Sequence, residues 1–176
     1  YRNYYHWWPA EKGTPTHRYS LFDENADAWK FDSTTNSYYL HYFSRKQPDL
    51  NWENPALRNE MYDIMKFWLD KGVAGFRLDA FPFMAKDTSW PAMPKDFTNE
   101  QFIRYYGADE KVHNYLKEMN EKVLSRYEDV YTVGEGGVIP FNKMMDYVSE
   151  DRNELNTLYH DELANAWGRG SFDGGE

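Results

Sequence analysis

From residue 54 onward the sequence alternates between helical and strand patterns. Asn54 and Pro55 are typical of a helix start, apolar residues then follow helical spacing, and Lys71–Gly72 is typical of a helix end. Further along the chain we expect a strand over 73–80, a helix over 109–127, a strand over 129–137, a shorter helix over 140–152 and a weaker strand over 154–163. This order is typical of a parallel α/β sheet.

The segment before residue 54 lacks this alternation. Residues 1–37 are aromatic, polar and interrupted by proline and glycine, so we expect an irregular, loop-rich segment there. The run SYYLHYF at 37–43 predicts a strand, paired as a hairpin with AWKFD at 28–32. A second loop, rich in proline, is expected over 81–100.

Composition excludes some partners and leaves others open. The formal net charge of -9 argues against nucleic acid and against an anionic membrane surface, because phosphate binding needs a basic face. Aromatic residues make up 19% of the chain, which fits either a large aromatic core or a site that stacks on sugars or planar ligands. Without cysteine, disulfides and thiolate-held metals are impossible, and a cytoplasmic location fits. Neither a leader nor a long apolar run occurs, so we expect a chain without a membrane partner.

The run GVAGFRLDAF at 72–81 places Arg77 and Asp79 on the same side of an apolar strand. Such a strand is expected to be buried on both faces, where ionised groups are costly unless they are paired or used. Two interpretations explain the pattern: a buried structural ion pair, and a catalytic carboxylate held by arginine.

Two of the expected strands end in acids, Asp79 and Glu135. In parallel α/β folds the chemistry collects at the C-terminal ends of the strands, and neighbouring strands lie about 4.8 Å apart. The carboxyl groups would then approach the ~5–5.5 Å spacing of a retaining glycosidase pair. Arg77 would lower the pKa of Asp79, whereas an apolar strand end and a negative neighbour would raise the pKa of Glu135. The alternative for Glu135 is a turn carboxylate among glycines, which are too irregular for a nucleotide-binding loop.

Several motifs together resemble the α-amylase superfamily, glycoside hydrolase family thirteen. GFRLDA resembles its strand-four motif and TVGEGG its strand-five motif. QPDLNWENPALR at 47–58 resembles the motif of the oligo-1,6-glucosidase and α-glucosidase branch, and YRNYYHWWP, AWKFD and YYLHYFSRKQPDLNW resemble the B domain of that branch. The resemblance covers essentially the whole chain.

The resemblance implies the fold class: α/β, the central part of a (β/α)₈ TIM barrel preceded by most of a loop-rich B domain. Residues 1–52 would form the B-domain segment, and residues 53–176 a partial barrel of about strands four to six. The motifs that supply the family's substrate-fixing histidines and third carboxylate are absent, so the chain resembles an internal fragment. We expect such a fragment to be inactive alone and to self-associate through open barrel edges.

The resemblance also implies roles for individual residues. Asp79 would be the catalytic nucleophile, Glu135 the general acid/base, and Arg77 the arginine that orients the nucleophile. Ala80 and Phe81 are expected to contact substrate. Ala80 resembles a linkage selector, because valine at this position accompanies α-1,6 activity and alanine or threonine accompanies α-1,4 activity; simple packing is the alternative. Neither a metal nor a cofactor is expected.

Three further positions carry expectations. Asp49 is expected to fix the loop that joins the B domain to the barrel. Gly136–Gly137 replaces bulkier residues of many relatives, which would open the subsite beyond the cleaved bond. Near residue 160 the sequence YHDE departs from the family's strand-six pattern, so we assign His160 and Asp161 no catalytic role.

The functional hypothesis is a retaining α-glucosidase that hydrolyses short α-glucosides, with α-1,4 or mixed linkage, through a covalent glycosyl-enzyme intermediate. Its substrate would be an oligosaccharide or disaccharide. The first alternative is a glucosyl-transferring enzyme or sucrose isomerase of the same branch. Two others are a non-catalytic scaffold module similar to a transporter heavy chain, and a carbohydrate-binding fragment without catalysis.

Overall fold

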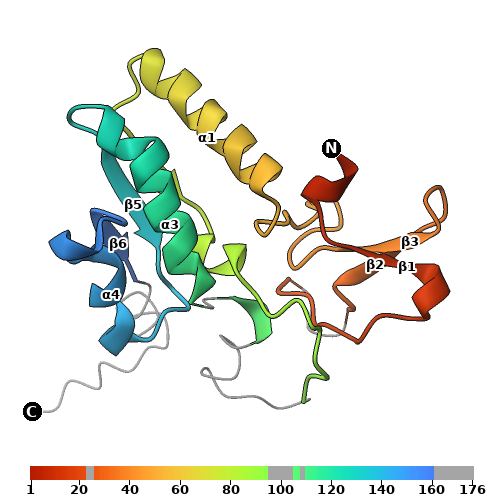
Figure 1. The fold of residues 1–176 in the computed structure, drawn as a ribbon. Helices are drawn as coiled ribbons and strands as arrows, with labels where there is room; N and C mark the ends of the chain where they lie inside the picture. The colour runs from red at the N-terminus through yellow and green to blue at the C-terminus, as the bar shows by residue number, and fades with distance from the viewer. Residues whose placement is uncertain (23–25, 95–104, 108–109, 161–176) are drawn as a thin grey trace, which may run out of the picture.

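The computed structural model describes residues 1–22, 26–94, 105–107 and 110–160. It contains two three-stranded sheets. Figure 1 shows them on opposite sides of the molecule, with helices α1 (Pro55–Asp70) and α3 (Lys111–Lys122) beside the second. In the described part of the chain, every helix is too short or too polar to cross a membrane.

The first sheet is antiparallel and comes from the N-terminal segment. Its strands, in spatial order, are β1 (Trp7–Pro9), β3 (Ser37–Leu40) and β2 (Trp29–Asp32). β2 and β3 pair with Trp29 opposite Leu40, which confirms the predicted hairpin. The pattern did not predict β1, because three residues ending in proline carry too little alternation. Pro9 fits there since β1 lies at the edge of the sheet.

The second sheet is parallel, as the alternation predicts. Its strands, in spatial order, are β4 (Gly75–Leu78), β5 (Tyr131–Glu135) and β6 (Thr157–Tyr159). Leu78 lies opposite Gly134, and Glu135 lies opposite Tyr159, so the C-terminal ends of the three strands are level. Among the described strands β4 pairs with β5 alone, which makes it an edge strand.

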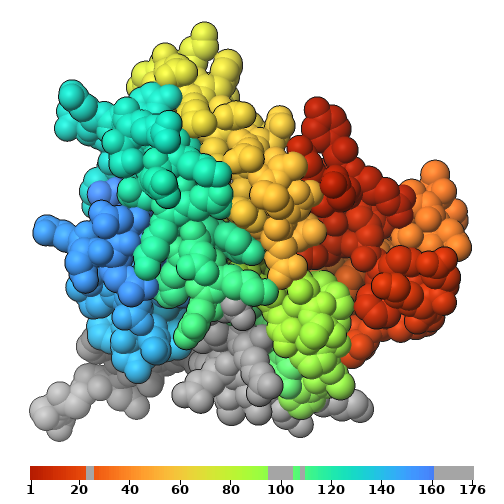
Figure 2. Space-filling view, viewed as in Figure 1, coloured from red at the N-terminus to blue at the C-terminus, as the bar shows by residue number. Residues whose placement is uncertain are grey.

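Helix α1 has the predicted boundaries. The side chain of Asn54 accepts a hydrogen bond from the backbone N–H of Ala56 at 2.9 Å, and Pro55 occupies the first helical position. Gly72, just beyond the helix, takes a φ of 90°, a conformation that glycine adopts without steric cost. Figure 2 shows α1 packed between the N-terminal segment and α3, and Arg58 of α1 forms a 2.6 Å ion pair with Glu118 of α3.

Several elements are shorter than predicted, among them β5, which spans Tyr131–Glu135 where 129–137 was expected. The strand expected over 73–80 begins only at Gly75, because the N–H of Val73 still bonds to the carbonyl of Trp68 and closes the last turn of α1. The helix expected over 109–127 ends at Lys122. There Val123 leaves helical geometry with a φ of -129° and buries its side chain, and the chain continues as a 3₁₀ turn, η4 (Leu124–Arg126).

The helix predicted over 140–152 is wrong as a single element. It is divided into η5 (Phe141–Lys143), α4 (Met145–Val148) and η6 (Glu150–Arg152). Ser149 ends α4: its backbone is extended, and the carbonyl of Met145 accepts hydrogen bonds from both its N–H, at 3.1 Å, and its hydroxyl, at 2.7 Å. The remaining 3₁₀ turns are η1 (Arg2–Tyr4), η2 (Ala10–Lys12) and η3 (Phe81–Met84).

Parts of other predicted segments lie outside the described residues. Of the weaker strand expected over 154–163, β6 contains 157–159, and residues 161–163 are outside. The proline-rich loop expected over 81–100 opens with η3, and residues 95–100 are outside.

Two buried clusters hold the described part together. One lies between the parallel strands and their helices, and its fully buried members include Val112, Leu116 and Val123. The other is largely aromatic and lies under the antiparallel sheet, where the rings of Tyr42 and Tyr106 approach to 4.9 Å. Much of the aromatic content is therefore core, one of the two explanations that composition left open.

A buried ion pair joins the N-terminal segment to the loop after β4. Asp49, which precedes α1, accepts a hydrogen bond from Lys86, whose side chain is only 1% exposed. His6 lies 3.9 Å from the same carboxylate, but burial lowers its pKa to about 3, so it stays neutral at pH 7. Asp49 thus fixes the segment before α1 against the loop after β4. Its expected role in the loop that joins a B domain to a barrel stays a prediction.

Replacing Lys86 with methionine would leave Asp49 buried and unpaired. We expect Lys86→Met to lower the free energy of unfolding by about 3–5 kcal/mol, measured by urea denaturation. The matched control is Lys66→Met, which breaks an exposed pair with Asp63 and should cost at most ~1 kcal/mol. Asp49→Leu combined with Lys86→Met should restore most of the loss, and a double variant as unstable as Lys86→Met would contradict the assignment.

Candidate active site

The ends of the three parallel strands bring the predicted acids together. Asp79 follows the last residue of β4, Leu78, which lies opposite Gly134, so Asp79 is level with Glu135 at the end of β5. In a parallel sheet, residues at matching positions of neighbouring strands project to the same side. Both carboxylates therefore project to the same side of the sheet.

One guanidinium contacts both acids. Nη1 of Arg77 donates to Oδ1 of Asp79, and Nη2 lies 3.1 Å from Oε2 of Glu135. The expectation that Arg77 and Asp79 point to the same side is confirmed. The expectation of burial is wrong: their side chains are 48% and 75% exposed, because β4 is an edge strand of the described sheet. This is therefore not a buried structural ion pair.

The neighbours of Asp79 favour its ionised form. The pKa of Asp79 is lowered, first by the hydrogen bond from Arg77 and next by a hydrogen bond with Glu135. Both contacts stabilise the carboxylate form of Asp79.

The backbone fixes one oxygen of Glu135. Oε2 accepts a hydrogen bond from the N–H of Ala80 at 2.9 Å and also faces Nη2 of Arg77. Ala80 has a φ of 46°, in the left-handed region, and this turn aims its N–H toward β5. Because Oε2 already faces two N–H donors, a proton on Glu135 belongs on the other oxygen, Oε1.

Phe81 packs its buried side chain beneath the turn at Ala80. Its ring is 1% exposed and meets Tyr147 edge to face, with centroids 5.6 Å apart. A Cβ atom added to Gly134 would lie 2.7 Å from Cε1 of Phe81, so glycine at 134 makes room for the ring. Phe81 also lines a cavity beside Asp79.

A cleft of about 500 Å³ opens over both carboxylates, within the usual size of a small-molecule site. It is lined by Leu21, Phe22, Phe43, Gln47, Asp79, Ala80, Phe83, Glu135, Gly137 and Val138. Phe43 meets Phe22 edge to face at 5.4 Å and Phe83 at 5.7 Å, which forms an aromatic wall facing the acids. The cleft therefore combines planar apolar surfaces with charged groups, as sugar binding requires.

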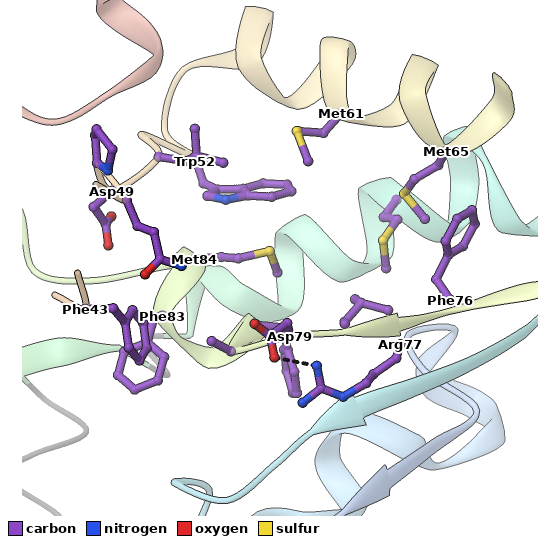
Figure 3. Close-up of a pocket in the computed structure, with 17 residues that line it drawn as sticks. Phe43, Asp49, Trp52, Met61, Met65, Phe76, Arg77, Asp79, Phe83 and Met84 are labelled. Atoms are coloured by element: carbon purple, nitrogen blue, oxygen red, sulfur yellow. Dashed lines mark hydrogen bonds and ion pairs between the residues drawn. The ribbon is translucent and has the colours of Figure 1, made fainter. Parts of the chain in front are cut away.

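A second cavity of about 440 Å³ lies against Asp79 from the side of α1. Figure 3 shows Met61 and Met65 of α1 above it and Asp79 with Arg77 along its floor. Trp52 and Met84 add to its apolar lining, which also includes Phe76, Leu78 and Met119. Flexible methionines adapt to irregular apolar shapes, so this cavity is suited to apolar surface rather than to hydroxyl groups.

Tyr159 was not among the residues that the sequence indicated. Its hydroxyl, at the end of β6, accepts a hydrogen bond from Nε of Arg77 at 3.1 Å and another from Nη2. Its position at the end of a third parallel strand could have indicated that it lies near the acids. That strand, however, was predicted only weakly, over 154–163.

His160, the residue after Tyr159, does not join the acids. Nε2 of His160 lies 3.2 Å from the carbonyl oxygen of Ile139, and Asp161 lies outside the described residues. Within the described ranges, no group of three or more histidine or acidic side chains is arranged to hold a metal ion.

Removing the charge of Arg77 tests its effect on Asp79. We expect Arg77→Met to raise the pKa of Asp79 toward its ordinary value, because the hydrogen bond and the positive charge that favour the carboxylate are both lost. The pKa is read from a ¹³C NMR titration of the Asp79 carboxyl group. Lys30→Met, on the distant strand β2, is the control, and an unchanged titration in Arg77→Met would contradict the assigned cause.

Comparison with known proteins identifies relatives along nearly the whole chain. The family described as "Alpha amylase, catalytic domain" matches residues 1–168. An oligo-1,6-glucosidase of Parageobacillus thermoglucosidasius is 45% identical over 168 residues, which cover 92% of this chain and 29% of that protein. An alpha-glucosidase of Pediococcus pentosaceus is 40% identical over 161 residues, covering 90% of this chain and 28% of that protein. The chain thus spans less than a third of the length of these relatives.

Solved structures agree with the same fold class. Isomaltulose synthase SmuA from Protaminobacter rubrum matches with a TM-score of 0.81 and 39% identity, covering 92% of this chain and 28% of that one. Trehalose-6-phosphate hydrolase TreA from Bacillus licheniformis matches with a TM-score of 0.83 and 35% identity, covering 94% and 29%. These matches confirm the predicted α/β class and the part of a TIM barrel. The chain belongs to the α-amylase family of glycoside hydrolases, glycoside hydrolase family thirteen.

Proposed function

We propose that the protein containing this chain is a retaining α-glucosidase that acts on short α-glucosides. The observation that carries the proposal is the convergence of Asp79 and Glu135 on one guanidinium, at the level ends of two neighbouring parallel strands. The cleft above them adds the aromatic wall that a sugar ring needs. The family and the printed names of the relatives support the same reaction class.

In the first step Asp79 attacks the anomeric carbon while the glycosidic bond breaks. Glu135 transfers its proton, held on Oε1, to the departing oxygen. The lowered pKa of Asp79 supports its role as nucleophile, because an ionised carboxylate is required there. The product of this step is a glycosyl ester on Asp79 and a free alcohol.

In the second step water replaces the leaving group. Glu135, now a carboxylate, takes a proton from water, and the resulting nucleophile attacks the anomeric carbon. The ester bond breaks and Asp79 leaves as a carboxylate. Throughout, the N–H of Ala80 holds Oε2 of Glu135, so that Oε1 is the oxygen that exchanges the proton.

Two observations bear on the linkage that is cleaved. Ala80 lines the cleft, and alanine at this position supports α-1,4 or mixed linkage. Several relatives are named oligo-1,6-glucosidases, which supports inclusion of α-1,6 bonds in the substrate range. Ala80 remains a proposed substrate-contact residue. Phe81 was expected to contact substrate as well, but its ring is buried beneath the turn, so we propose that it shapes the site through Ala80.

Glucosyl transfer to a sugar acceptor is the second candidate. Isomaltulose synthase SmuA and trehalulose synthase MutB are among the similar solved structures, at 39% and 38% identity. Gly137, which lines the cleft beside Glu135, leaves space on the acceptor side. Product analysis with sucrose distinguishes the two, because water and sugar compete for the same intermediate.

Other expectations stay proposals. Residues 1–52 would form the B-domain segment and 53–176 the partial barrel. The edge of β4 supports the expectation that this chain alone would self-associate. The cytoplasmic location remains a prediction from the cysteine content. The intact acids, Asp79 and Glu135, argue against a non-catalytic scaffold.

Trapping the intermediate tests the proposal. A 2-deoxy-2-fluoro-α-glucosyl donor with a good leaving group should accumulate an adduct, because the fluorine slows the second step. Mass spectrometry of a digest of the full-length protein should place the adduct on the peptide with Asp79. Glu135→Gln should slow hydrolysis of ordinary glucosides by about 10²–10⁴-fold yet spare donors whose leaving group needs no proton. Asp63→Asn is the control, and an adduct on another residue would overturn the assignment.

A substitution at position 80 tests the linkage assignment. Ala80→Val narrows the cleft beside Asp79, and we expect the ratio of kcat/KM for isomaltose over maltose to rise about tenfold. Ala74→Val, at an exposed position before β4, is the matched control. An unchanged ratio in Ala80→Val would mean that Ala80 only packs.

A further inference from the structure

Tyr159 completes a row of polar groups across the parallel strands. It lies opposite Glu135 in the register of β5 and β6, and Glu135 in turn is level with Asp79. The proposed reaction uses the acids and Arg77 but assigns nothing to this phenol.

The hydroxyl of Tyr159 engages one edge of the Arg77 guanidinium. Nε and Nη2 both donate to it, while Nη1, at the other end, donates to Asp79. The guanidinium is planar and its N–H groups form a rigid fork, so fixing one edge also fixes the direction of the remaining donors. Tyr159 therefore determines where Nη1 and Nη2 point.

Arg77 needs such an anchor. Its side chain is long and, in the described part of the chain, 48% exposed, and such side chains lose considerable rotamer freedom when they are held in one geometry. The residue beside it on β5 is Val133, which has no polar side-chain atom. Asp79 is itself 75% exposed, so the carboxylate alone is a weak restraint on the arginine.

We propose that Tyr159 is a positioning residue, whose hydroxyl holds the Arg77 guanidinium so that Nη1 faces Asp79 and Nη2 faces Glu135. This inference rests on the proposed function for its catalytic consequence, but the positioning itself is a property of the three strand ends. Tyr159 acts through Arg77 and does not contact the reacting atoms.

The consequence concerns the protonation of Asp79. Among the residues that the structure describes, the charged or titratable groups facing it are Arg77 from β4, Glu135 from β5 and, across the second cavity, Asp49 paired with Lys86. Without the contact to Tyr159, the Arg77 guanidinium is hydrogen-bonded to Asp79 for a smaller fraction of the time. The Asp79 carboxylate then loses part of its stabilisation. Its pKa then moves upward, and the acid limb of the rate profile moves to higher pH.

The test is Tyr159→Phe, which removes the hydroxyl and keeps the ring. In the full-length protein we expect kcat to fall about tenfold, because the charged guanidinium loses both of its hydrogen bonds to the hydroxyl, while KM stays within about twofold. The acid limb of the kcat/KM profile should move to higher pH. The matched control is Tyr127→Phe, which removes a 2.9 Å hydrogen bond to Asp70 far from the acids and should leave kcat and the profile unchanged.

A double-variant cycle separates positioning from packing. If Tyr159 acts through Arg77, adding Tyr159→Phe to Arg77→Met should cost no further activity, because the arginine that it holds is already gone. Equal losses in both backgrounds, or an unmoved acid limb in Tyr159→Phe, would overturn the proposal.

A readout independent of turnover keeps the two proposals distinct. The Asp79 carboxyl should titrate at higher pH in Tyr159→Phe than in the unaltered protein, as followed by ¹³C NMR. If the unaltered protein neither hydrolyses glucosides nor forms an adduct, the proposed function fails while this titration still decides the role of Tyr159. An unchanged titration would refute the positioning role even in a fully active enzyme.

Discussion

The shared guanidinium of Arg77 is the interaction on which the candidate site depends. Two carboxylates at the ends of adjacent strands repel each other unless a positive charge or a proton lies between them. Arg77 supplies the charge, and its contacts with Asp79 and Glu135 make their approach favourable. The two acids thereby acquire different surroundings, with Asp79 on Nη1 and Glu135 against the backbone N–H of Ala80.

The rest of the fold brings the other walls to this point. The buried ion pair of Asp49 and Lys86 connects the N-terminal segment to the loop after β4. The aromatic cluster forms the core of the N-terminal segment. As a result Phe22 and Phe43, from the N-terminal segment, line the same cleft as the two acids of the parallel sheet. The cleft thus lies between the two buried clusters, which are connected by the buried ion pair of Asp49 and Lys86.

The sequence predicted the parts of the structure that depend on local patterns. The caps of α1, the hairpin of β2 and β3, and the parallel order of the later strands follow from capping residues and periodicity. The end of α4 within 140–152 depends on the backbone of Ser149, which takes an extended conformation. The exposure of Arg77 depends on which strands flank β4. Tyr159 contacts Arg77 only because distant strands lie in register, and no local pattern encodes that contact.

At position 80 the backbone and the side chain have separate tasks. The N–H of Ala80 holds the proposed proton donor, while its methyl group faces the cleft. Every amino acid except proline offers the same N–H group. A replacement that keeps the left-handed backbone of residue 80 can therefore alter the shape of the pocket without moving the N–H that holds the acid, so that selectivity can change across descendants while the chemistry is inherited.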